Sequence, residues 1–253
     1  MEYFVQKGSV VREIWGKSDT ILFIFAGASS EFALNKAVDW LYFTGKLPAD
    51  PLGRLFSTVT YARKIVFSEK EAALKAIDTI TAIHSAVEAN RNSKIPDWAY
   101  RDVLFMLIHY SIASFELLER KLTAGEKEEV FDVFYRFGTQ MHLQGLPHNY
   151  TEWLIMRKDH LNNHLEKGIY SVDLYKQYKK HLGLIRYNLL LEAQILVVPA
   201  EVNALLKLGK FSWLRNILTA YKLARKMKLD GFIKSIILPN KYKREIKTLD
   251  VAV

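Results

Sequence analysis

The 253-residue chain contains no cysteine. Without thiols it can form no disulfide, no thiolate metal site and no cysteine nucleophile. Glycine and proline are also few, at 12 and 6 residues, which argues against long disordered tracts and favours a packed globular protein. A glycine-rich phosphate loop, a Gly-x-Ser-x-Gly turn and a nucleotide-binding fingerprint are absent as well. The sequence therefore supports neither a kinase nor a serine hydrolase.

Long hydrophobic runs are missing too. The most apolar stretches are 21–28 and 103–118, and the second is interrupted by His109 and Glu116. A membrane-spanning helix needs roughly 18–20 uninterrupted apolar residues, so both stretches are predicted to be core segments. The first residues lack the basic start and apolar run of a signal peptide. We therefore expect a cytoplasmic protein.

Positive charge is concentrated near the C-terminus. Residues 203–247 contain twelve Lys or Arg against only Asp230 and Glu245, whereas the whole chain has a net charge of +9. Aromatic residues such as Trp213 and Tyr221 alternate with these cations, as in a basic amphipathic helix. Such a helix either lies on an anionic membrane surface or docks on the protein with its basic face solvated, and we favour docking. We expect one domain over 1–253, with 203–247 as a helical extension packed on it, and no nucleic-acid partner.

The hydrophobic pattern is helical along nearly the whole chain, so the predicted fold class is all-α. The segment 97–121 is apolar on almost every face and is predicted to be a buried central helix in a globin-like cluster. A capping box from Thr123 to Glu126 marks one helix start, while residues 20–25 resemble a strand. The predicted helices are 29–43, 52–67, 69–91, 97–121, 125–144, 149–166, 171–192, 200–208, 211–228 and 230–237.

Two features suggest a binding site. His84 lies on the apolar stripe of the helix 69–91, where a neutral imidazole needs a hydrogen bond or a metal to offset its desolvation. A hydrogen-bonded core histidine is the commoner outcome. Arg54 and Thr58 lie one turn apart on one helix face and could together bind an anion such as a carboxylate. A solvated arginine is the simpler interpretation of that pair.

Two further histidine positions have competing interpretations. His109, in the buried helix, either approaches a bound cofactor or forms a hydrogen bond within the core, and we favour the core role. His160 and His164 lie four residues apart and could bind a metal, but no glutamate follows His160 as in zinc peptidases. The surrounding stretch is polar, and we predict that this pair belongs to a solvated helix face.

Several short motifs recur in a particular order: Asp50-Pro51, Arg54-x-x-x-Thr58, His84-x-x-Val87, Trp98-x-Tyr100-x-Asp102-x-Leu104 and Ile108-His109, then Gly145-Leu146-Pro147 and Leu238-Pro239-x-x-Tyr242. This arrangement, covering about residues 15–245, resembles the MpaB/rubber-oxygenase (latex clearing protein) family. Each motif is permissive, so the resemblance depends on their order and spacing.

The resemblance implies an enzyme that uses heme b and dioxygen. His84 would be the proximal iron ligand, with Arg54 and Thr58 beside the heme and His109 as a further candidate near it. The substrate would be apolar, isoprenoid or lipid-like, and enter an apolar pocket. The alternative is a non-catalytic helical module that binds an apolar ligand or an anionic membrane surface.

Two departures from the family pattern concern catalysis. Rubber-cleaving members have a lysine immediately before the motif threonine, where this chain has Ser57. They also have a catalytic glutamate upstream of the arginine, whereas no glutamate lies between Glu31 and Arg54. Asp39 is the nearest acid at a comparable position and is the candidate base, although a salt-bridging role suits it equally. The MpaB branch is therefore the closer comparison.

Overall fold

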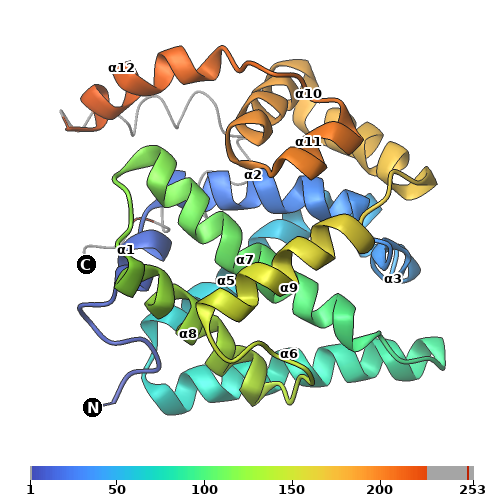
Figure 1. Cartoon of the computed structure of the whole chain (residues 1–253). Helices are drawn as coiled ribbons and strands as arrows, with labels where there is room; N and C mark the ends of the chain where they lie inside the picture. Colours follow the sequence, from blue (N-terminus) through green and yellow to red (C-terminus); the bar gives the residue numbers. More distant parts are fainter. Residues whose placement is uncertain (1, 227–249, 251–253) are drawn as a thin grey trace.

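The computed structural model of the chain describes residues 2–226 and Asp250 (Figure 1). In this part of the chain the regular secondary structure is helical, and the only β-type pairings are the isolated bridges Tyr3–Glu69 and Asn35–Leu165. The all-α, multi-helix prediction is confirmed. The helices are α1 (Val10–Trp15), α2 (Ser18–Leu34), α3 (Val38–Phe43), α4 (Lys46–Ala49), α5 (Pro51–Phe67), α6 (Lys70–Arg91), α7 (Asp97–Leu118), α8 (Ala124–Gln140), α9 (Tyr150–Asn163), α10 (Ile169–Val197), α11 (Ala200–Leu206) and α12 (Leu214–Lys226).

Two buried helices, α2 and α7, cross at the centre of the molecule (Figure 1). Both are apolar on most of their surface, so neither has a face suited to solvent. They approach closely at Gly27, where an added Cβ would lie only 2.3 Å from the Tyr110 ring. The predicted burial of α7 is confirmed. The second central helix was not predicted, because residues 20–25 resemble a strand.

Several predicted boundaries are wrong for identifiable local reasons. The expected helix 29–43 is interrupted at Asn35, whose backbone is extended and whose side-chain oxygen accepts the Ala37 N–H. This side-chain hydrogen bond replaces helical pairing at that point. The expected helix 171–192 is longer and kinks at Gly183, where φ is +72°, a conformation that favours glycine. The short helices α1 and α4 were not predicted, and the expected helix 230–237 lies outside the described residues.

Two other helix starts have clear capping chemistry, and one of them was predicted. Thr123 and Glu126 form the reciprocal capping box before α8, which satisfies two otherwise free N–H groups. At α5, the Asp50 side chain accepts the Gly53 N–H at 3.0 Å, and Pro51 occupies the first helical position. This rigid start fixes the rotation of α5 and thus the direction of Arg54 and Thr58.

The described part of the basic C-terminal region is attached to the body through ion pairs. Arg225 of α12 bonds to Asp19 and to Glu119, each at 2.7 Å, and Leu218 is buried. Within the described residues, the helices are all too short or too polar to span a bilayer.

Candidate functional site

Helices α5 and α6 pack together and bring three of the predicted site residues into one region. Arg54 donates hydrogen bonds from Nη1 to Thr58 Oγ1 at 2.8 Å and to Ser57 Oγ at 3.2 Å. The Arg54 cation is also close enough to His84 to lower the pKa of that imidazole. The face of α5 that carries Arg54 and Thr58 thus lies near the stripe of α6 that carries His84.

The His84 ring is oriented by two contacts. Its Nδ1 lies 2.9 Å from the Ile80 carbonyl oxygen, and because a carbonyl can only accept, Nδ1 must carry the proton. Its ring also meets the Tyr100 ring edge-on, with centroids 5.3 Å apart. The lone pair is therefore on Nε2, which has no hydrogen bond to any of the residues described. This is the tautomer that a metal-binding histidine needs.

Charges around His84 favour its neutral form. Burial lowers the pKa of His84, and the nearby Arg54 cation lowers it further, against the Ile80 carbonyl and Glu88, which raise it. Arg54 is exposed as a whole residue, but crowding around its guanidinium lowers the pKa of Arg54 too. No carboxylate among the described residues pairs with Arg54. The region therefore combines a neutral imidazole with a cation that lacks an acidic partner.

Glu88, one turn beyond His84, organises the same region and was not predicted. It is buried, and its carboxylate accepts hydrogen bonds from the Tyr100 hydroxyl at 3.2 Å, the Ile95 N–H at 2.9 Å and Lys94 at 2.9 Å. These bonds fix Tyr100, which in turn borders the His84 ring. The four-residue spacing of His84 and Glu88 was the sequence signal for this arrangement.

Asp39, the candidate base, forms an ion pair with Arg91 at 2.6 Å. The Arg91 guanidinium also lies over the Trp40 ring, 4.0 Å from its centroid. Arg91 follows His84 by seven residues, so its backbone lies two turns, about 10 Å, farther along the same face of α6. Asp39 is therefore joined through Arg91 to the helix that carries the imidazole.

The structure does not bring His109 to this region. His109 lies nine residues beyond Tyr100 on α7, about 13 Å farther along the helix axis. It is hydrogen-bonded to the backbone of Val197, and its Nε2 is buried without a partner among the described residues. Burial lowers the pKa of His109 to about 4, and the Arg157 cation acts in the same direction. His109 is therefore a neutral core histidine beside a different cluster.

That second cluster, which we call the buried polar cluster, consists of Glu31, Asp102, Arg157, His160 and His164. The Arg157 guanidinium donates to both oxygens of the Glu31 carboxylate, from Nη1 to Oε1 and from Nη2 to Oε2, the second at 2.6 Å. His160 lies between two carboxylates, with Nε2 2.8 Å from Glu31 Oε1 and Nδ1 2.6 Å from Asp102 Oδ2. Three helices, α2, α7 and α9, supply these side chains.

Ionisation within the buried polar cluster is strongly coupled. Burial by itself would raise the pKa of Glu31, but Arg157 and His160 hold it far below its usual range. Burial would likewise lower the pKa of His160, yet Asp102 and Glu31 raise it. The cluster therefore holds two carboxylates against a guanidinium and an imidazolium, so the buried charges balance.

The prediction of a solvated face for His160 and His164 is wrong for His160, whose side chain is only 1% exposed. The residues next to His160 and His164 are polar, so this part of α9 resembles a surface helix. The missed signal is the spacing of Trp153, Arg157, His160 and His164, which places them on one face of α9. Glu31, a lone acid in an apolar helix, was the matching signal on α2.

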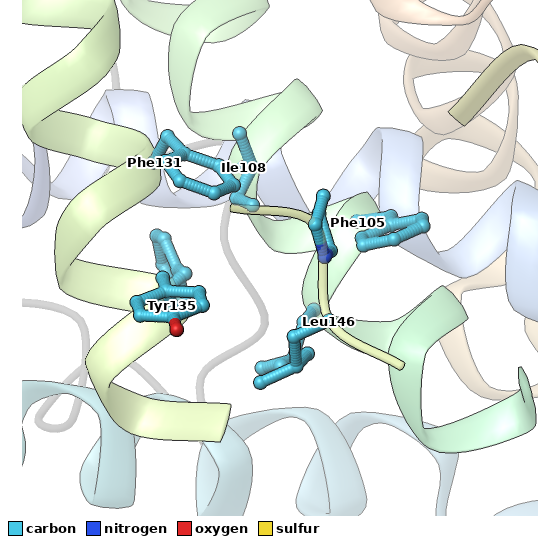
Figure 2. A pocket seen from close by; sticks show the side chains of 8 residues that line it. Phe105, Ile108, Phe131, Tyr135 and Leu146 are labelled. Carbon is cyan, nitrogen blue, oxygen red and sulfur yellow. The ribbon is translucent and has the colours of Figure 1, made fainter. Parts of the chain in front are cut away.

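A small cavity lies between α7, α8 and the turn at Leu146 (Figure 2). Its walls are apolar and include Phe105, Ile108, Phe131 and Tyr135, and its volume of about 10 Å³ has room for about one water. None of Arg54, Thr58 and His84 borders it. This cavity is therefore not a site for a large cofactor.

A comparison with protein-family models matches residues 16–216 to the domain described as "ER-bound oxygenase mpaB/B'/Rubber oxygenase, catalytic domain". The matched segment contains α2 to α11, and with them both His84 and the buried polar cluster. No curated protein and no solved structure gave a match.

Proposed function

The chain belongs to the MpaB/rubber-oxygenase catalytic-domain family, and from this membership we propose that it is a heme b dependent oxygenase acting with dioxygen on a hydrophobic, isoprenoid or lipid-like substrate. An oxygenase-type function follows from the family itself. The cofactor, the substrate class and the residue roles are the proposal. Because the chain has no cysteine, a thiolate iron ligand is excluded and histidine is the natural one.

The state of His84 is the structural observation that supports heme at this site. Its Nδ1–H donates to the Ile80 carbonyl at 2.9 Å, so the Nε2 lone pair is left for a metal. In the proposed site His84 would hold the iron, and Tyr100, itself bonded to Glu88, would keep the His84 ring from rotating.

Arg54 supplies the second part of the site. Its guanidinium has no carboxylate partner among the described residues and bonds only to neighbouring hydroxyls, at 2.8 Å for Thr58. A planar guanidinium suits a carboxylate such as a heme propionate, and Thr58 keeps it in place. Bound heme would supply dioxygen binding and activation, the chemistry that the side chains of this protein lack.

Asp39 is the proposed proton acceptor. Its ion pair with Arg91 ties the carboxylate to the helix that carries His84. From there Asp39 would accept a proton from the substrate, and the Arg91–Trp40 contact would limit its movement. Ser57, in place of the lysine of rubber-cleaving members, removes a cation from this region and favours a substrate other than rubber.

The test is heme binding by the purified protein. We expect hemin to produce a Soret band at one heme per chain, and His84→Ala to abolish or shift that band. His148→Ala is the control, because this exposed histidine lies outside both clusters. Under reducing conditions, the heme-loaded protein should consume dioxygen when a short isoprenoid alcohol is added. Failure of the native protein to take up heme would end the proposal.

A second candidate role, contact with an anionic membrane, is favoured by the region around α12. Phe211, Trp213, Ile217 and Leu223 are exposed there, Phe211 at 90%, and they lie beside cations such as Arg215. Exposed aromatic and aliphatic side chains among cations suit a lipid interface. This role predicts salt-sensitive binding to phosphatidylserine vesicles, which Phe211→Ser together with Trp213→Ser should weaken. It would also bring the protein to an apolar substrate.

A further inference from the structure

We propose that Asp102, His160 and His164 form a binding site for a divalent transition-metal ion, separate from the heme site. Each of the three offers one ligand atom, and these atoms all lie within 4.8 Å of one another. The proposal does not depend on heme binding, because it uses none of the residues around His84.

The distances suit a tetrahedral ion. Asp102 Oδ2 is 2.6 Å from His160 Nδ1 and 3.0 Å from His164 Nδ1, and the two Nδ1 atoms are 3.4 Å apart. Bonds of about 2.0–2.1 Å to a tetrahedral zinc ion place neighbouring ligand atoms about 3.3 Å apart. The two contacts of His164 Nδ1 are within about 0.3 Å of this spacing, and the Asp102–His160 pair would open by about 0.7 Å to accommodate the ion.

The helices position these ligands with little freedom. His160 lies in the last turn of α9 and His164 is its C-terminal cap, so the two imidazoles lie one turn apart on one face. Asp102 comes from α7, on the opposite side of the site. An ion bound here would connect the C-terminal end of α9 to the start of α7.

A second layer of hydrogen bonds supports the ligands. His160 Nε2 is 2.8 Å from Glu31 Oε1, so an ion on Nδ1 would leave an Nε2–H that donates to a carboxylate. This carboxylate–histidine–metal arrangement is typical of metal sites, since it fixes the tautomer and the ring. Arg157 holds Glu31, and Asn35 donates to Asp102 Oδ2 at 3.3 Å.

The site can be reached from one side. The Asp102 and His160 side chains are 2% and 1% exposed, whereas His164 is 25% exposed. The Trp98 ring packs against the His164 ring, with centroids 4.6 Å apart. A metal ion would therefore enter beside His164 and keep a fourth position for water.

The ligand types narrow the choice of metal. Two imidazole nitrogens and one carboxylate suit zinc and other first-row divalent ions, whereas magnesium and calcium prefer oxygen ligands only. Zinc is the natural test ion because it has no redox chemistry. Cobalt(II) can replace it and reports the ligand geometry through its visible absorption.

The experiment measures zinc binding by the full chain after chelator treatment. We expect one ion per chain, a rise in melting temperature on zinc addition, and a visible Co²⁺ spectrum typical of tetrahedral ligation. His164→Ala should weaken zinc binding by more than about 100-fold, since loss of a ligand exceeds the effect of losing an outer hydrogen-bond partner. Asp102→Asn, which keeps the shape of the side chain, should do the same.

Two controls separate this site from others. His181→Ala removes an exposed histidine outside the cluster and should leave zinc affinity unchanged, and His84→Ala should remove heme binding but not zinc. His164→Ala, conversely, should retain the heme. Zinc binding that survives both His164→Ala and Asp102→Asn, or a native chain that binds no zinc, would overturn the proposal. Circular dichroism without metal shows that each variant is folded.

Discussion

The region around His84 and the buried polar cluster satisfy their polar groups in opposite ways. Around His84 the structure leaves the imidazole Nε2 without a hydrogen bond and the Arg54 cation without a carboxylate partner among the described residues. In the buried polar cluster, by contrast, His160 has a carboxylate on each side and Arg157 grips Glu31. In the proposed site, these groups of the first region would bind the heme. The second stabilises itself, and its groups can bind only an ion that replaces a shared proton.

The largest expected effect is on stability, from breaking the buried ion pair. Arg157→Met should lower the free energy of unfolding by about 3–5 kcal/mol, because it leaves the Glu31 carboxylate buried without its main partner. Arg54→Met, the matched change in the other cluster, should cost under ~1 kcal/mol, since Arg54 has no carboxylate partner. Urea denaturation of both variants measures the difference. Equal losses would contradict the contrast between the clusters.

The second-largest expected effect is the change in the free energy of unfolding with pH, and it involves His109. Its pKa is about 4 in the folded chain against the usual 6.5. Because the unfolded chain gains a proton first, this residue contributes stability above pH 6.5 that is lost as the pH falls toward 4. The difference corresponds to about 3 kcal/mol.

His109→Gln should therefore lose less stability than the native protein between pH 7 and pH 4.5. Denaturant titrations at several pH values test this. His148→Ala, which removes an exposed histidine, should keep the native pH profile. If the native and His109→Gln profiles are parallel, the buried neutral histidine does not account for the acid sensitivity.

A methyl group at Gly27 tests the close approach of the helices that frame the buried polar cluster. The added Cβ would lie 2.3 Å from the Tyr110 ring, and this ring carries the hydroxyl that donates to Glu31 at 2.8 Å. We expect Gly27→Ala to destabilise the protein by about 1–3 kcal/mol through overpacking. Gly125→Ala in α8, where the added atom meets nothing within 4 Å, should be neutral or slightly stabilising. Thermal melts that rank the two variants the other way would refute this packing.

The smallest effect on stability is expected from Asp39→Asn, which breaks the ion pair with Arg91 of α6. The Asp39–Arg91 pair is partly exposed, at 36% and 27% of the side chains, so its loss should cost less than about 1 kcal/mol. If Asp39 accepts a proton in the reaction, oxygen turnover by the heme-loaded variant should fall about 100-fold. Heme binding should not change. Unaltered turnover would assign Asp39 a salt-bridging role only.

The region around His84 was accessible from the sequence because its signals are local. Arg54 and Thr58 are one turn apart on α5, and His84 lies on the apolar stripe of α6, so helical periodicity defines the face of each. Two helices adjacent in the chain then pack together. The unpaired state of Arg54 and the role of Glu88 were not predicted, because they depend on which acids lie nearby in space.

The buried polar cluster could not be predicted in this way. Its members lie on α2, α7 and α9, and His160 is separated from Glu31 by 129 positions. The polar composition of α9 indicated a solvated helix, whereas three-dimensional packing buries one of its faces against carboxylates. A charged residue within an apolar helix indicates that a partner is needed, but not which residue provides it.

The sequence by itself determined that the chain is helical, where most helices lie, which family it belongs to, and that any metal must be bound without thiolates. These properties depend on periodicity, on motif order and on composition, which are all local or additive. Only the tertiary structure decided that α2 shares the centre with α7, that His160 is buried between two carboxylates, and that His109 lies away from His84. The reason is that electrostatic partners and desolvation are set by distances in space, which the order of residues along the chain does not contain.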